Sequence, residues 1–487
     1  MNDCGRKNIH FALWILIAGC FFPASGWAQT GLSPRQIKKL SVEELMNIEV
    51  TLVSRMPEKL SEAASAIQVI TYEDIRRSGA TNVPEALRLA PNLQVSQLSA
   101  GIWIISARGF NSVFSNKLLV MIDGRTVYTP LYGGVLWEQQ NLLLEDVDRI
   151  EVVSGPGGTL WGANAVNGII NIVTKHTRNT QGLFASVGAG TFVKDIVSLR
   201  YGGNIGKKGN YKVYAQHADR DDTKMPDGTG NADAWDMTQA GFRADWEATK
   251  KDAFTLQGDL YAGNRQTKPA KSDLNGQNIL GRWTRTISAQ SEMSLQLYYD
   301  RYFRRDVTTA SYDKINTIDI DFQHGFPMGK KQSLVWGLGY RYVKDDANFP
   351  VVAGAGIAPR FKRLDLYSGF IQDEIRLTER LKFTLGAKLL HNAYTGLEWQ
   401  PNARLAWVNK GNTLWAAVSR AVRTPSRLDV DYYLPITPQP PNVPSVAGGP
   451  DFVSEKLVAY ETGYRFQPNA VSSFSISVFY NVYSDVY

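Results

Sequence analysis

Alternating apolar and polar positions run through the chain from about Gly182 to its last residue. In one such segment Phe254 and Leu256 alternate with Thr255 and Gln257. A period of two is typical of a β-strand with one apolar and one polar face. About fifteen segments of this kind, each roughly 10 to 16 residues long, follow one another. They predict a large antiparallel sheet with one apolar face.

The connections between these segments alternate between short and long. Tight turns fall near Gly206, Lys250, Ala289, Gly329, Glu379, Gly411 and Pro468. The longest intervening loops are 221–232, 267–276, 344–362 and 425–453. Short turns on one side and long loops on the other are typical of a transmembrane β-barrel. A soluble β-sandwich has no reason to keep this parity through so many hairpins.

A different pattern precedes the repeat. Residues 64–71 predict a strand, and segments 72–77 and 83–89, ended by Gly79 and Pro91, predict two short helices. This region is expected to be a small mixed α/β unit that extends to about His176. Further upstream, Ser41 followed by Glu44 is a capping-box pair and predicts another short helix.

The amino terminus has the features of a secretory signal. Arg6 and Lys7 precede an apolar block at 11–22, and a small-residue cleavage site follows at 26–28. The block is too short to span a bilayer as a helix. The mature chain is therefore expected to begin near Gln29.

Both cysteines lie in this leader. Its removal would take away Cys4 and Cys20 and leave a mature chain without thiols, which excludes disulfides. In a competing interpretation, 17–20 is a lipoprotein cleavage box and Cys20 is lipidated. The sequence leaves these two interpretations open.

Composition excludes several classes of protein. The mean hydropathy of -0.24 argues against a helical membrane protein. The net charge of +7 is spread along the chain without a basic block, so nucleic-acid binding is not expected. The five histidines lie far apart, and none has a second histidine or cysteine at ligand spacing.

The glycine-rich segment 152–158 does not complete a nucleotide-binding motif. Leu160 stands where the third glycine of a dinucleotide fingerprint would fall, and Ala163 stands where a phosphate-binding loop would have lysine. Ser154 has no base nearby in the sequence. We therefore expect no enzyme activity, no cofactor and no metal site.

Several short motifs occur in order between residues 47 and 175: Arg108-Gly109-Phe110, Met121-Ile122-Asp123-Gly124, Arg149-Ile150-Glu151-Val152, Gly155-Pro156 and Gly168-Ile169-Ile170-Asn171-Ile172. In this order they resemble the plug of the TonB-dependent outer-membrane receptors. Segments 418–426 and 455–464 resemble motifs from the middle of the same family's barrel. The resemblance implies a mixed α/β plug domain inside a transmembrane antiparallel β-barrel, located in the cell outer membrane.

The resemblance implies four parts. These are a signal peptide at 1–28, an amino-terminal segment with a candidate TonB box at 29–60, a plug at 61–178 and an incomplete barrel at 179–487. Plugged outer-membrane transporters have about 22 strands, and about 15 are predicted here. Open strand edges are not tolerated in hydrocarbon. The chain is therefore expected to be a fragment or the product of a truncated gene, with about seven strands missing.

The candidate TonB box comprises Glu49, Val50, Thr51, Leu52 and Val53, which alternate apolar and polar residues. The resemblance implies that this strand detaches and pairs with the periplasmic partner TonB, a mode of recognition that depends on extended backbone. The alternative is an ordinary edge strand of the plug.

The resemblance also implies that Arg108, Arg149 and Glu151 form ion pairs between the plug and the barrel wall. The alternative is that these charges satisfy one another within the plug. Ser154 departs from the family, which often has arginine directly before the Gly-Pro pair, so one wall contact is in doubt.

Two segments could hold a solute on the outer side. Tyr128, Tyr132 and Trp137 offer rings for stacking on a large ligand, and Asn111 and Asn116 bound a second apical loop. Aromatic residues at such positions serve equally well in packing.

The resemblance implies a monomeric receptor in outer-membrane lipid for energy-coupled uptake of a scarce large solute, an iron–siderophore or cobalamin-type chelate. Its partners would be this ligand and TonB with the inner-membrane energising complex. A passive porin-like or structural barrel is the alternative, and a signalling receptor is a third hypothesis. The sequence does not identify the substrate, because specificity lies in loops that follow no general rule.

Overall fold

The computed structural model describes residues 46–267, 270–349, 356–435, 444–469 and 471–487. The predicted signal peptide, Cys20 and the capping pair of Ser41 and Glu44 lie outside the described residues. None of the described helices is long and apolar enough to cross a membrane.

The first part of the described chain is built on a five-stranded mixed sheet. Its strand order is β3 (Ala66–Thr71), β10 (Val147–Ser154), β11 (Gly168–Thr174), β6 (Leu118–Ile122) and β7 (Arg125–Thr126). β11 and β6 are parallel, and the other neighbours are antiparallel. This unit is called the plug below.

Short elements complete the plug. They are β1 (Glu49–Val50), β2 (Glu58–Lys59), α3 (Tyr72–Ser78), α4 (Val83–Leu87), β4 (Leu93–Gln97), β5 (Trp103–Ala107), β8 (Tyr128–Thr129), β9 (Gly134–Val135), η1 (Trp137–Gln139), η2 (Leu144–Asp146), α5 (Gly158–Trp161) and η3 (Thr177–Asn179). Both predicted helices are present. α3 begins at a capping box formed by Thr71 and Asp74 and ends at Gly79, whose φ of 73° suits glycine.

The main plug core lies between the sheet and the two helices. Ile75, Ala86 and Leu87 from the helices pack against Ile150 and Ile170 from the sheet, and all are nearly inaccessible to solvent. The near-continuous apolar sequence of β6 and β11 follows from this position, because both faces of these strands are covered.

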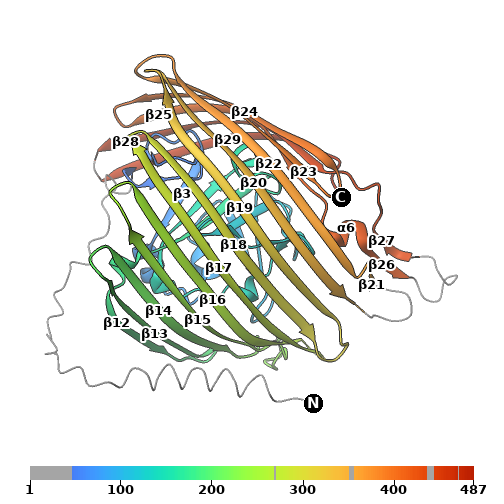
Figure 1. The fold of residues 1–487 in the computed structure, drawn as a ribbon. Coiled ribbons are helices and arrows are strands. Elements are labelled where there is room, and N and C mark those ends of the chain that lie inside the picture. The colour runs from blue at the N-terminus through green and yellow to red at the C-terminus, as the bar shows by residue number, and fades with distance from the viewer. Residues whose placement is uncertain (1–45, 268–269, 350–355, 436–443, 470) are drawn as a thin grey trace, which may run out of the picture. The chain divides into compact units, whose positions relative to one another are not determined.

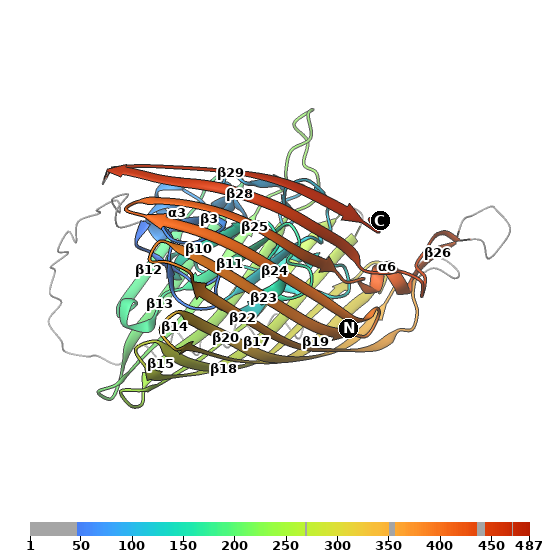
Figure 2. The ribbon, with the colours of Figure 1, turned by 90° about the horizontal axis from the view of Figure 1, so that it is seen from above.

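The second part is a sheet of fifteen strands among the described residues, called the wall below (Figure 1). Its strands are β12 (Gly182–Gly188), β13 (Val193–Ile205), β14 (Gly209–Arg220), β15 (Trp235–Glu247), β16 (Asp252–Thr267), β17 (Ala270–Ser288), β18 (Ser291–Asp306), β19 (Tyr312–Met328), β20 (Gln332–Asn348), β22 (Phe361–Arg376), β23 (Leu381–Asn392), β24 (Gly396–Asn409), β25 (Asn412–Arg423), β28 (Glu455–Asn469) and β29 (Ser472–Ser484). Each pairs antiparallel with the next, and the sheet curves around the plug (Figure 2).

One edge of the wall carries short turns, at 206–208, 248–251, 289–290, 329–331, 377–380 and 410–411. We call this the short-turn edge and the opposite one the long-loop edge. The longest segment at the long-loop edge, 424–454, contains α6 (Arg427–Asp431), β26 (Tyr432–Pro435) and β27 (Pro444–Ala447), and β26 also pairs with β21 (Gly356–Ile357).

One predicted loop is wrong. Residues 267–276 were expected to be a long loop, but β16 and β17 stay paired up to Thr267 and Ala270. Because β17 also pairs with β18 from Ser272 onward, both neighbours supply hydrogen bonds to this polar stretch. Polar composition therefore did not prevent strand formation.

The predicted alternation of the wall is confirmed. On β24, Leu397 and Trp399 are 69% and 55% exposed, whereas Gln400 and Asn402 are 0% and 3% exposed. The buried polar residues face the plug, and the apolar ones point away from it. This is the arrangement of a membrane barrel with lipid outside and a polar interior.

Candidate functional site

The predicted TonB box lies in a small hairpin docked on the plug. β1 and β2 pair so that Glu49 lies opposite Lys59, and we call residues 49–59 the amino-terminal hairpin. Val50, Leu52 and Val53 are buried in a second apolar cluster with residues of the plug sheet. The hairpin is therefore packed as a part of the plug.

Backbone groups of the hairpin bond to both the plug and the wall. The indole nitrogen of Trp161 donates to the carbonyl of Leu52 at 2.8 Å. Arg404 of β24 donates to the carbonyl of Val53 at 3.4 Å. A partner strand can reach the backbone of these residues only after the hairpin has left this position, so binding to TonB stays a prediction.

Arg55 fastens the hairpin to the wall. Its guanidinium lies 2.8 Å from Asp321 of β19 and packs over the rings of Trp161 and Phe370, at 4.4 and 4.7 Å from their centroids. Its backbone φ of 56° is left-handed, which is uncommon outside glycine. The Arg55 side chain is 6% exposed and that of Asp321 is 30% exposed, so this pair is shielded from water on the arginine side only.

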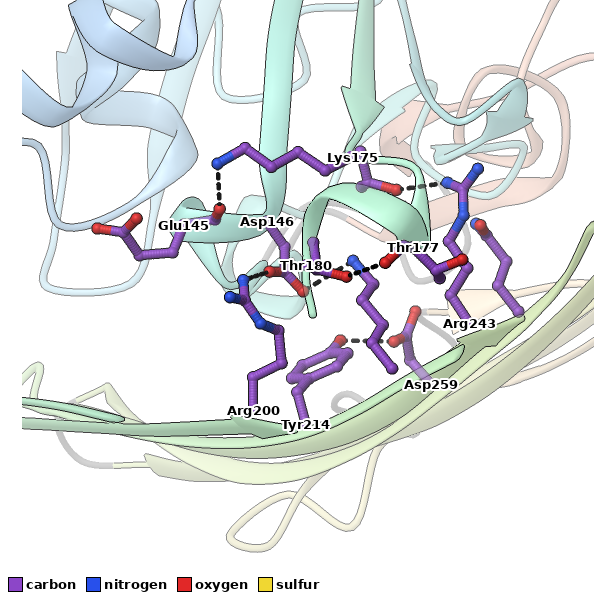
Figure 3. A network of polar contacts seen from close by, with 12 residues as sticks. Glu145, Asp146, Lys175, Thr177, Thr180, Arg200, Tyr214, Arg243 and Asp259 are labelled. Carbon is purple, nitrogen blue, oxygen red and sulfur yellow. Dashed lines mark hydrogen bonds and ion pairs between the residues drawn. The ribbon is translucent and has the colours of Figure 1, made fainter. Parts of the chain in front are cut away.

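The end of the plug nearest β12 is fastened to the first wall strands. Asp146 of η2 pairs with Arg200 of β13 and with Lys212 of β14 at 2.7 Å (Figure 3). Thr177 of η3 donates from both its backbone nitrogen and its hydroxyl to Asp245 of β15, at 2.9 Å each. Buried carboxylates with several donors hold this region in one geometry.

Asp123 extends the same network to the turn after β6. It accepts hydrogen bonds from Thr174 at 2.7 and 2.9 Å and from Gln257 of β16 at 3.0 Å, and Arg243 of β15 lies 3.6 Å away. Burial alone would raise the pKa of Asp123, but Arg243 and the bonds from Thr174 outweigh it and hold the pKa below its ordinary value.

On the other side of the plug, two cations meet β28. Arg108 lies 2.6 Å from Glu461, with side chains 6% and 9% exposed. Lys117 pairs with Glu455, and burial lowers the pKa of this lysine. Arg108 thus has the plug-to-wall geometry that the sequence suggested for it.

Arg149 and Glu151 require a correction. Arg149 pairs with Asp148 and Glu151, at 2.9 and 2.8 Å, and Glu151 also accepts from the backbone of Thr51. β10 lies between β3 and β11 in the plug sheet, so these two side chains, two residues apart on one face, reach each other before they reach the wall. Burial raises the pKa of Glu151.

Two of the predicted solute-binding aromatics are also corrected. Trp137 is 6% exposed and belongs to the main plug core. Tyr132 is 8% exposed, donates to Asp313 of β19 at 3.1 Å and lies under the guanidinium of Arg304. Both rings are used in packing and cannot stack on a ligand in this conformation.

The other predicted contacts lie nearer to solvent. Tyr128 is half-buried and donates to the carbonyl of Asn116 at 3.2 Å, and burial raises its pKa. Asn111 is exposed and Asn116 is half-buried in loop 110–116. Their role in solute binding stays a prediction.

The sequence interpretation missed the apolar surface of this loop. Phe110, Val113 and Phe114 are 39%, 46% and 41% exposed, and Phe114 stacks on Tyr132 with ring centroids 5.6 Å apart. Val113 and Phe114, the apolar residues between Asn111 and Asn116, could have indicated this surface from the sequence. Exposed rings in a plug loop are more informative than buried ones, because they are free to contact a solute.

The wall side chains that hold the hairpin region were missed as well. Arg465 of β28 donates to the carbonyls of Leu60, Ala63 and Ser65, and Thr413 of β25 donates to the carbonyl of Ser61. These bonds join residues about 350 to 400 positions apart, and no local sequence pattern predicts them.

Within the described residues, no group of three or more His, Cys, Asp or Glu side chains is placed to hold a metal ion. The charged residues of the plug and wall are mostly paired with one another. The arrangement holds the plug within the curved wall through ion pairs and hydrogen bonds to strands from β13 to β29.

Comparison with known protein families agrees with this geometry. A family model described as TonB dependent receptor-like, beta-barrel, matches residues 191–487, and the TonB-dependent Receptor Plug Domain matches residues 59–169. The chain belongs to the TonB-dependent receptor family. Members of this family are outer-membrane transporters and not enzymes.

Individual relatives are distant. The iron-regulated outer membrane virulence protein of Vibrio cholerae is 23% identical over 96% of this chain and 71% of its own length. The vitamin B12 transporter BtuB of Vibrio cholerae is 32% identical, over 34% of this chain and 26% of its own length.

Solved structures share the fold. The siderophore receptor PirA of Acinetobacter baumannii gives a TM-score of 0.71 at 17% identity, over 92% of this chain and 73% of that one. The ferric enterobactin receptor PfeA of Pseudomonas aeruginosa gives 0.70 at 18% identity, over 86% and 71%. At such identities the likeness concerns the fold.

Proposed function

We propose that this protein takes up a scarce large solute across the outer membrane, an iron–siderophore or cobalamin-type chelate, with energy supplied through TonB. The observation that carries the proposal is the amino-terminal hairpin, which is packed on the plug and pinned to the wall by Arg55. A pull on residues 49–53 is transmitted directly to the contacts that keep the plug in place. The relatives include a siderophore receptor and a vitamin B12 transporter, which supports this class of solute.

A passive porin-like or structural barrel is the second candidate. The plug argues against it, because its sheet and core lie within the curve of the wall and are bound to strands from β13 to β29. A diffusion pore does not need a plug that is held in its lumen by buried ion pairs on several sides. The signalling hypothesis has no observation in its favour in the described residues.

Loop 110–116 is the proposed first contact for the solute. Asn111 and Asn116 lie there beside exposed Phe110 and Phe114. We keep the predicted division into an amino-terminal segment to 60, a plug at 61–178 and a wall from 179, in which the hairpin at 49–59 belongs to the amino-terminal segment although it packs on the plug. The last plug strand ends at Thr174 and the first wall strand begins at Gly182, which supports it. A monomeric state remains part of the proposal.

Growth of a receptor-deficient strain on ferric enterobactin and on vitamin B12, with and without TonB, tests the proposal. Deletion of residues 49–53 is expected to abolish TonB-dependent growth. A milder variant is Glu49→Pro, which removes a backbone donor needed for strand pairing. Glu49 is exposed, so Glu49→Ala is the matched control and should grow like the unmodified protein. TonB-independent growth of the deletion variant would favour the porin.

A further inference from the structure

A row of polar and cationic side chains crosses the wall near its long-loop edge, on the neighbouring strands β18, β19, β20 and β22 (Figure 1). Arg301 of β18 lies opposite Asn316 of β19, which in turn lies opposite Lys344 of β20. Lys344 lies opposite Arg363 of β22. Val343, the residue before Lys344, is buried in a cluster with residues of the plug. Because side chains alternate along a strand, the row points away from the plug and toward the membrane.

The cations of this row are poorly neutralised. Lys344 and Arg363 are like charges directly opposite each other, which is unfavourable in an antiparallel pair. Among the described residues, the side chains of Arg301 and Lys344 make no hydrogen bond or ion pair, and neither does Lys314, two residues nearer the long loops on β19. Arg363 pairs with Asp365 at 2.8 Å, but its side chain is 64% exposed. We call Arg301, Lys314, Lys344 and Arg363 the cationic patch.

Two carboxylates lie beside the cationic patch, and each has a cation of its own. Asp365 pairs with Arg363. Asp346 lies opposite Lys314 in the ladder, but it is bound by Arg360 at 2.9 Å. The three unpaired cations therefore remain as excess positive charge on this part of the outer face.

The surface next to the patch, on the side away from the long loops, is apolar and aromatic. Ile318 and Ile320 of β19 are both 41% exposed. Tyr299 and Tyr342 flank Ile318 on the neighbouring strands, and the guanidinium of Arg363 lies 5.0 Å from the ring centroid of Tyr342. Aromatic residues of this kind lie where hydrocarbon meets the head groups, and the long loops of a transmembrane barrel face the outside of the cell. The patch therefore lies at the level of the outer-leaflet head groups.

The width of the row indicates the kind of anion that fits it. Its ends are three strand spacings apart, which is about 14 Å at about 4.8 Å per spacing. One phosphate group is too small to contact both ends. Clusters of Lys and Arg at a membrane surface bind the phosphate groups of lipid head groups.

We infer that the cationic patch binds the head group of an outer-leaflet lipid that carries two phosphate groups. Arg301 contacts one phosphate, and Lys344 and Arg363 contact the other. The acyl chains of this lipid lie on the apolar surface around Ile318 and Ile320. The inference goes beyond the proposed function, because it concerns the lipid around the wall and holds for any solute.

A binding measurement with the purified full-length protein in detergent tests the patch. Fluorescently labelled diphosphoryl lipid A is the probe. Each cation lost near a lipid surface weakens binding about fivefold. Lys344→Gln is therefore expected to weaken binding about fivefold, and the triple variant Arg301→Gln, Lys314→Gln, Lys344→Gln about a hundredfold. Monophosphoryl lipid A should bind the parent at least about fivefold more weakly than diphosphoryl lipid A, and excess inorganic phosphate should not displace the probe.

The matched control is the triple variant Lys207→Gln, Lys250→Gln, Lys330→Gln. It removes the same charge from exposed lysines in the turns of the short-turn edge, and its affinity should stay within about twofold of the parent. Heat-dependent mobility in gel electrophoresis establishes first that each variant is folded. The inference is overturned if the patch variant binds like the parent or if the control loses as much affinity. Equal binding of monophosphoryl lipid A, or displacement of the probe by inorganic phosphate, overturns it as well.

Discussion

Arginine residues make many of the contacts between plug and wall. Arg108 and Arg243 each place a guanidinium beside a carboxylate with little exposure to water, and Arg55 places a buried guanidinium beside the partly exposed Asp321. Arginine suits this position because its planar group is always charged and makes directed bonds to carboxylates. At residue scale, the plug is held by many polar contacts with the wall, from Asp146 with Arg200 on β13 to Asn167 with Tyr483 on β29.

Removal of one partner of the Arg108–Glu461 pair is expected to lower the stability of the protein more than removal of both partners. Arg108→Ala leaves Glu461 buried without its cation and should lower the free energy of unfolding by about 3–5 kcal/mol. The double variant with Glu461→Ala should recover part of this loss. Urea unfolding in detergent measures all three variants. Equal losses in the single and double variants would contradict the coupling.

At the scale of elements, the amino-terminal hairpin depends on its packing. Its two strands have two residues each, so the ladder between them is too short to be stable alone. Burial of Val50, Leu52 and Val53 holds the hairpin on the plug, and Arg55 holds it on the wall. Such an element can leave as a unit without unfolding the sheet beneath it.

Protonation of Glu58 is expected to tighten the docked hairpin. Burial raises the pKa of Glu58 from 4.5 to about 7, and Glu374 adds to the rise. Because the pKa is higher in the docked state than in the released one, docking is strongest below pH 4.5. It weakens as the pH rises from 4.5 to about 7.

Glu58→Gln removes this pH dependence. Backbone hydrogen exchange of residues 49–59 is compared between the two proteins at matched pH. They should be similarly protected near pH 4.5, and above pH 7 the variant should be about tenfold better protected. Equal protection at both pH values would show that Glu58 does not control docking.

At the scale of the whole molecule, the wall separates two solvents. Its outer face carries exposed apolar residues such as Leu297, which is 50% exposed on β18, and its inner face carries buried polar residues such as Gln296, which is 8% exposed. Adjacent residues of one strand are therefore expected to differ in what they tolerate: apolar substitutions on the outer face and polar substitutions on the inner face.

Leu297→Arg is expected to impair assembly in the membrane. A charge on the lipid face near the bilayer midplane costs about 2–4 kcal/mol, whereas a charge on the inner face is accommodated by polar neighbours. Ser294→Arg, on the inner face of the same strand as Gln296, is the control. The folded fraction is measured by heat-dependent mobility in gel electrophoresis. Similar folded fractions would mean that Leu297 does not face lipid.

Individual residues show which features could be predicted from the sequence and which could not. The helix after Thr71 was predictable because its capping residues and its terminal glycine are close together in sequence. Trp137 was misassigned because an aromatic residue beside glycines looks the same in a binding loop and in a core. Arg149 was misassigned because its nearest carboxylate was two residues away and not on the wall.

The sequence by itself determined the alternation of the wall strands, the parity of turns and loops, and the order of plug motifs, because these depend on neighbours within a few residues. The tertiary structure decided which charges join plug to wall and where the hairpin docks. Those features depend on pairs such as Arg55 and Asp321, 266 positions apart, which the curvature of the sheet brings together.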